Sequence, residues 1–221
     1  MSVPVLALAH CPLTPQAVAE YVGLPTAPHV PEDFDAVEAE VERRGWDFTE
    51  MVCESLLTGS GHVVCADGMS PFGRPGIRSF LVFGELYPPD PDDEPLDNGP
   101  WLYGLIDDWQ ALPGWSGQRP CTAQDCEAVL ARAARTVAEH LGAEPERTVP
   151  SADEALGPSL PQYIWRTGTH ALIVGPASDN GPYGYLTHLQ LSCTPLDCAP
   201  ELPPAGEEEA LRGWIRAHID W

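Results

Sequence analysis

The sequence predicts an α+β fold, in which an antiparallel sheet packs against several helices. Strand and helix patterns occur in separate blocks along the chain, which favours this class over a doubly wound sheet. Residues 163–193 have the pattern of an antiparallel meander, and residues 122–141 have the clearest helical pattern. With 221 residues, 43% of them hydrophobic, we expect one domain spanning residues 1–221.

The start of the chain predicts a strand, a short helix and a further helix. An apolar run at 3–9 predicts the strand. Residues 14–23 begin with a threonine N-cap and a proline and end at a glycine, which is the pattern of a short helix. Residues 46–57 carry apolar and aromatic side chains at helical spacing, so we expect another helix there.

Residues 31–44 predict an acidic amphipathic helix that ends at Gly45. Phe34, Val37 and Val41 fall on one face, which we expect to be buried. The polar face carries six carboxylates, on Glu32, Asp33, Asp35, Glu38, Glu40 and Glu42.

The middle of the chain predicts strands at 62–66 and 77–86, followed by an acidic loop at 87–100. The loop holds five prolines, five acidic residues and no basic residue, so it cannot bury much surface and we expect it to be extended or mobile. A strand at 101–106 and a short helical turn at 107–112 are predicted after it.

The second half of the chain predicts the helix at 122–141, the meander and a last helix. Thr122 and Asp125 form a pair that resembles a capping box at the start of the first helix. The last strand of the meander alternates apolar and polar residues, which predicts one mostly apolar face. The last helix is predicted at 205–219.

The charge of the chain excludes several classes of function. It contains 33 acidic residues, 11 arginines and no lysine, with a formal net charge of -22. Such a surface repels nucleic-acid phosphates and anionic lipids and favours basic partners. The absence of lysine excludes a side-chain Schiff base and a P-loop lysine. No apolar run approaches the roughly 18 residues of a membrane span. We therefore expect a protein that binds neither nucleic acid nor membranes. Seven cysteines without an export signal favour reduced thiols in the cytoplasm, so we expect a cytoplasmic protein.

Two Cys-x4-Cys pairs share the frame Cys-Thr-x-x-Asp-Cys, at Cys121 and Cys126 and at Cys193 and Cys198. Four thiolates could form a tetrahedral zinc site, which makes a zinc-stabilised adaptor one alternative. However, Cys121 and Cys126 also occupy the two positions of a hydrophobic staple around the Thr122 N-cap. We favour the staple and assign no metal ligand and no cofactor.

The seven histidines match no catalytic motif, but some of them could converge in three dimensions. His170 and His188 lie on strands that could pair, and Asp107 and Arg166 could join them. An enzyme or a small-molecule-binding protein with such a site is therefore an alternative. We favour the interpretation that these histidines are half-exposed residues of a sheet, and we assign no catalytic residue.

The strongest candidate for an interface is the acidic loop together with the tryptophans that follow it. Aromatic side chains flanked by acids are typical of anchors for a basic protein partner. The alternative for the tryptophans is packing in the core. The candidate partner-binding residues are Asp90, Asp92, Asp93, Glu94, Trp101, Asp107, Asp108, Trp109 and Trp115.

The sequence thus predicts an acidic protein-binding domain. It is similar in general character, though in no motif, to immunity and antitoxin proteins, which are small and acidic and inhibit a basic partner. In the expected mechanism, carboxylates at 90–97 and on the polar face of 31–44 steer the partner toward the surface. Aromatic anchors would then fix the complex.

Overall fold

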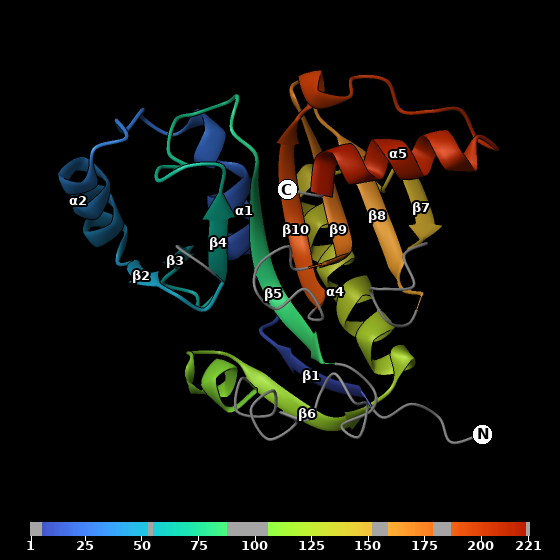
Figure 1. Cartoon of the computed structure of the whole chain (residues 1–221), viewed down its shortest axis with the longest axis horizontal. Coiled ribbons are helices and arrows are strands. Elements are labelled where there is room, and N and C mark those ends of the chain that lie inside the picture. Colours follow the sequence, from blue (N-terminus) through green and yellow to red (C-terminus); the bar gives the residue numbers. More distant parts are fainter. Residues whose placement is uncertain (1–5, 53–54, 88–105, 152–158, 179–186, 220–221) are drawn as a thin grey trace.

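A computed structural model describes residues 6–52, 55–87, 106–151, 159–178 and 187–219. It confirms the α+β class, because a large antiparallel sheet packs against helices on both of its faces (Figure 1). The ten strands of this sheet are β1 (Leu6–His10), β2 (Asp47–Thr49), β3 (Ser55–Leu57), β4 (Val63–Ala66), β5 (Ser79–Tyr87), β6 (Ser116–Cys121), β7 (Arg147–Pro150), β8 (Pro161–Arg166), β9 (His170–Ser178) and β10 (Thr187–Pro195).

The strand order in the sheet is β2-β3-β4-β5-β10-β9-β8-β7, and β1 pairs with both β5 and β6. Strands β2 and β7 therefore form the two ends of the main path. The α-helices are α1 (Pro15–Val22), α2 (Phe34–Arg44), α4 (Ala123–Leu141) and α5 (Glu208–Ile219), and residues 106–111 are also helical. Two short 3-10 helices are η1 (Leu24–Thr26) and η4 (Leu196–Cys198).

The core lies on both faces of the sheet, because β9 and β10 are covered on each side. Leu172 and Val174 of β9 belong to the apolar cluster that includes residues of α1 and α4. Ile173, which points to the other face, packs in a cluster with Trp214 and Ile215 of α5. Figure 1 shows α5 in front of the sheet and α4 behind it.

The structure confirms the predicted helix at 122–141 and the antiparallel meander. The Thr122 hydroxyl accepts a hydrogen bond from the Asp125 backbone N–H at 3.3 Å, and the Asp125 carboxylate accepts one from the Thr122 N–H at 2.8 Å. This is a full capping box with aspartate in place of glutamate. Strands β8, β9 and β10 pair antiparallel in sequence order.

The predicted helix at 46–57 is wrong, because β2 and β3 form a hairpin there. Gly45 adopts a left-handed conformation with φ 67°, and it ends α2 with hydrogen bonds from Gly45 N to Glu42 O and from Trp46 N to Val41 O. Pairing of β3 with β4 then extends the main sheet, and this tertiary pairing outweighs a local helical pattern of apolar residues.

Strands β6 and β7 were not predicted from the sequence, because both contain proline. Each of them has a sheet partner on one side only, β1 for β6 and β8 for β7, and such edge strands tolerate a residue that cannot donate a backbone hydrogen bond. The helix predicted at 31–44 begins three residues later, at Phe34, because the side chain of Asp33 caps it.

Strand β10 has the predicted mostly apolar face, with Leu189, Leu191 and Cys193 in the core, but its other face is buried too, because every residue from Thr187 to Pro195 is buried. Its polar residues His188, Gln190, Ser192 and Thr194 are buried on the second face. The prediction of half-exposed histidines is therefore wrong for His188 and for His170, which is also buried. The sheet is covered on both sides, so alternation in its central strand separates two buried environments rather than core from solvent.

Candidate protein-binding surface

Helix α2 and strand β2 present two phenylalanines to solvent at one end of the sheet. Phe34 is 54% exposed and Phe48 is 45% exposed. Their rings stack on each other, with centroids 5.6 Å apart and planes inclined by 14°. The prediction that Phe34 is buried with Val37 and Val41 is wrong: the two valines are in the core, whereas Phe34 lies at the first residue of the helix beside the exposed Asp33 and Asp35.

Exposed carboxylates run along α2 from Phe34. Phe34, Glu38 and Glu42 are spaced by four residues and therefore lie on one side of the helix. Glu38 and Glu42 are exposed, and neither forms an ion pair with any residue that the structure describes. We call Phe34, Glu38 and Glu42, together with Phe48, the aromatic–acidic surface. Asp47 and Glu50 add exposed carboxylates on either side of Phe48 in the sequence.

The opposite flank of α2 also carries charged residues, but there they are paired. Glu40 accepts two hydrogen bonds from the Arg43 guanidinium at 2.6 Å and one from Arg44 Nε at 2.7 Å. These bonds, first of all those from Arg43, lower the pKa of Glu40 to about 2. We call Glu40, Arg43 and Arg44 the paired flank.

The guanidinium of Arg44 is held by aromatic rings as well as by carboxylates. Its central carbon lies 4.7 Å from the ring centroid of Phe72 and 5.4 Å from that of Trp46. A second carboxylate, that of Glu20, lies 3.9 Å from Arg44 Nη1 and also accepts a hydrogen bond from the indole of Trp46 at 3.1 Å. This arrangement combines cation–π contact with charge-assisted hydrogen bonding.

Of the partner-binding residues predicted from the sequence, some are buried, some are exposed and some lie outside the described residues. Trp109 and Trp115 are 2% and 7% exposed, with ring centroids 4.1 Å apart. They therefore pack in the core, the alternative weighed above, and are not presented as surface anchors. Asp107 and Asp108 are exposed in the helical segment 106–111. The other predicted residues, Asp90, Asp92, Asp93, Glu94 and Trp101, lie outside the described residues, as does most of the predicted loop and strand between 87 and 106.

The residues of the predicted enzyme site do not converge. His170 lies opposite Pro195 and His188 opposite Ala177, so the two histidines are seven residues, or roughly 23 Å, apart along the sheet. Arg166 forms an ion pair with Glu146 at 2.7 Å. No hydrogen bond or ion pair between described residues joins Asp107 to any of these three side chains.

A buried acid–base pair that the sequence analysis missed joins β5 and β10. Glu85 and His188 are direct partners in the strand register, and Glu85 Oε2 lies 2.5 Å from His188 Nδ1. Their side chains are only 1% and 4% exposed, and the Phe80 ring stacks near the imidazole with centroids 6.0 Å apart. The pair links two neighbouring strands, and removing either side chain would take away a hydrogen-bond partner of a buried polar group. The sequence patterns did not indicate that β5 pairs with β10, so they could not show that Glu85 and His188 lie side by side.

Cys11, Ser60 and His62 form a second polar cluster. The Ser60 hydroxyl lies 2.9 Å from His62 Nδ1, and Cys11 Sγ donates to the Ser60 carbonyl oxygen at 3.7 Å. Burial lowers the pKa of His62 to about 4 and raises the pKa of Cys11 to about 11. Both groups are therefore uncharged at neutral pH, which is unlike a thiolate–imidazolium nucleophile.

The four cysteines of the two predicted pairs are in different environments. Cys121 and Cys126 are buried at the start of α4, Cys193 is buried in β10, and Cys198 is exposed in η4. The hydrogen bond with the Cys121 thiol, and then burial, raise the pKa of Cys126. Within the described part of the chain, no group of three or more histidine, cysteine or acidic side chains could hold a metal ion.

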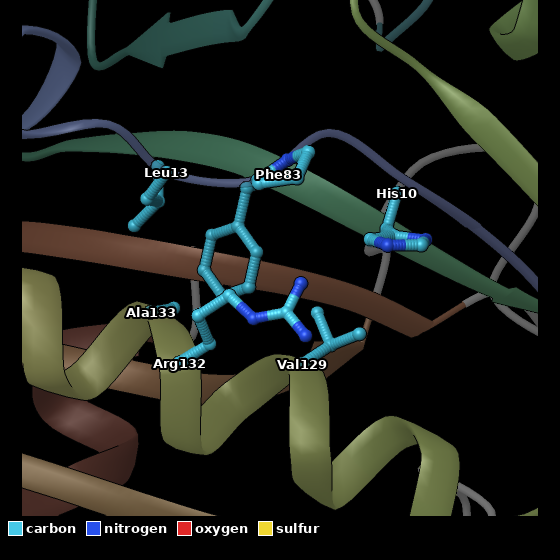
Figure 2. Close-up of a pocket in the computed structure, with 7 residues that line it drawn as sticks. His10, Leu13, Phe83, Val129, Arg132 and Ala133 are labelled. Atoms are coloured by element: carbon cyan, nitrogen blue, oxygen red, sulfur yellow. The ribbon is translucent and has the colours of Figure 1, made fainter.

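A small cavity lies between the end of β1 and helix α4. Figure 2 shows Arg132 rising from the helix beside Phe83, with His10 across from it. The cavity volume is about 10 Å³, which is close to the space that one water molecule needs. Burial, and then the positive charge of Arg132, lower the pKa of His10. The cavity is thus too small for an organic substrate.

The chain has no significant match to a protein-family model, a curated protein or a solved structure. None of the helices in the described ranges has both the length and the apolar character required to cross a bilayer.

Proposed function

We propose that this protein binds a basic protein partner and that the aromatic–acidic surface is part of the contact. One observation carries the proposal: Phe34 of α2 and Phe48 of β2 form a stacked, half-exposed pair. The exposed Glu38 and Glu42, which follow Phe34 along the helix, have no arginine partner among the described residues. Apolar rings surrounded by charge are typical of an interface rather than of an ordinary surface.

The energetics of such a surface favour association with a cation-rich protein. Fully covering an exposed phenylalanine side chain contributes about 1.5 to 3 kcal/mol. Phe34 and Phe48 are already about half covered, so a partner that covers the rest gains about half of that from each ring. The excess of negative charge accelerates encounter with a basic surface and repels acidic ones. The rings would then supply the short-range contacts, and the carboxylates would supply steering and charge complementarity.

The activity that fits these features is that of a cytoplasmic inhibitor of the immunity or antitoxin type, which caps the basic surface of its target. Cys11, Cys121, Cys126, Cys193 and Cys198 are free thiols, as is usual in a reducing compartment. In this proposal the exposed Asp107 and Asp108, and the acidic residues at 90–97, add to the negative charge of the chain that attracts the partner.

The proposal is tested by capture from the native lysate with three forms of the tagged protein. They are the wild type, Glu38→Gln/Glu42→Gln, and the matched control Glu127→Gln/Glu139→Gln on α4, where both glutamates are exposed. We expect wild type and control to retain the same basic protein in stoichiometric amount at low salt and to release it at high salt. The Glu38→Gln/Glu42→Gln variant should retain much less of it. Equal retention by all three forms, or no retained protein, would refute the proposed surface.

A further inference from the structure

We propose that the aromatic–acidic surface selects arginine over lysine on its partner. This inference rests on the proposed function and specifies the chemistry of that same surface. It follows from the juxtaposition of Phe34 and Phe48 with Glu38 and Glu42, and from the way in which the chain holds one of its own arginines.

Arginine fits this combination of groups better than lysine does. The guanidinium is planar and weakly hydrated, so it stacks on an aromatic face while its edge donates to a carboxylate. The lysine ammonium is a compact, strongly hydrated charge that does not stack in this way. A surface made only of carboxylates would attract both cations, whereas one with accessible ring faces prefers arginine.

The paired flank shows this chemistry within the chain. Arg44 lies over the rings of Phe72 and Trp46 while Glu40 accepts a hydrogen bond from its Nε at 2.7 Å. The aromatic–acidic surface has the same two kinds of group, rings and carboxylates, on the other side of α2, and its two phenylalanines are about half exposed. None of the ion pairs or cation–π contacts of the described residues places an arginine of this chain there. The partner would supply it.

The test measures binding of two probe peptides of equal length and charge to the full chain. One alternates arginine with glycine and the other alternates lysine with glycine, and both are titrated at low ionic strength by calorimetry. We expect the arginine peptide to bind about twofold to fivefold more tightly, which is the size of one exposed cation–π contact. In Phe34→Leu/Phe48→Leu, which keeps apolar bulk and removes the rings, the two dissociation constants should become equal.

Each outcome decides the inference. Preference for arginine that disappears in the leucine variant supports it, provided that circular dichroism shows the variant to be folded. Equal binding of both peptides by the wild type overturns the selection of arginine but agrees with a basic partner. A preference that survives in the leucine variant overturns the role of the rings. If neither peptide binds, the inference is also wrong, and capture from the lysate separately decides the proposed function.

Discussion

Helix α2 carries glutamates on two flanks that differ in their surroundings. On the paired flank, Glu40 binds two arginines, and Arg44 is covered by aromatic rings. On the other flank, Glu38 and Glu42 are exposed without ion pairs in the described structure, beside two rings that are also exposed. The first flank satisfies its charges internally and stabilises the fold. We infer that the second leaves its charges and rings to a partner.

The largest expected effect is on partner binding after charge reversal. Glu38→Arg/Glu42→Arg places two cations where the proposed basic partner approaches, and like-charge contact costs several kcal/mol. We expect the dissociation constant for the captured partner to rise about 100-fold or more. The same reversal at Glu127 and Glu139 of α4 should change it far less, because those residues lie on another element. Similar losses in both variants, measured by calorimetry, would mean that only net charge matters.

The next effect is on stability and concerns the paired flank. Glu40→Gln removes the carboxylate that binds Arg43 and Arg44, so we expect the free energy of unfolding at pH 7 to fall by about 0.5 to 1 kcal/mol. Chemical denaturation with circular dichroism measures this change. An unchanged unfolding midpoint would show that the pairs on this flank contribute no stability.

The same glutamate predicts a dependence of stability on pH. Its pKa in the folded state is about 2, below the ordinary value of 4.5, so its contribution is present above pH 4.5 and is lost as the pH falls from 4.5 toward 2. Glu40→Gln should therefore flatten the stability profile in that window. A profile with the same slope in wild type and variant would contradict the assigned pKa.

The smallest expected effect is an increase in the free energy of unfolding when Glu42 is replaced, opposite in sign to the effect at Glu40. Glu38 and Glu42 are like charges four residues apart on one helix, an arrangement that destabilises by about 0.2 to 0.5 kcal/mol. Glu42→Gln should therefore raise the free energy of unfolding slightly while weakening partner binding. Replicate denaturation curves resolve the sign, and a loss of stability would indicate that Glu42 has a structural role.

The sequence was sufficient to predict elements whose signals are local. Thr122, Asp125 and Gly142 mark α4 at both ends, and the meander is visible because β8, β9 and β10 follow one another in the chain. Strands β2 and β3 were missed because their sheet is completed by β4, which lies later in the chain. The apolar residues of 46–57 also have helical spacing, which favoured a helix over strands in the prediction.

The candidate surface could be predicted only in part. The acidic character of residues 31–44 and the need for aromatic anchors followed from composition. Which aromatics remain exposed depends on packing: Trp109 and Trp115 are covered in the core, whereas Phe34 sits at the helix start and meets Phe48 after Gly45 ends the helix. Hydrophobic spacing alone does not distinguish these cases, because it does not show which parts of the chain cover a given face.

The most direct test compares two single substitutions on the same helix, Glu38→Gln and Glu40→Gln, against the captured partner. Each removes one negative charge, so any difference between them comes from the flank rather than from net charge. We predict that Glu38→Gln weakens binding about threefold to tenfold, whereas Glu40→Gln leaves the dissociation constant within about twofold at physiological ionic strength. Equal weakening by both substitutions, or greater weakening by Glu40→Gln, would contradict the division of α2 into a stabilising flank and a binding flank.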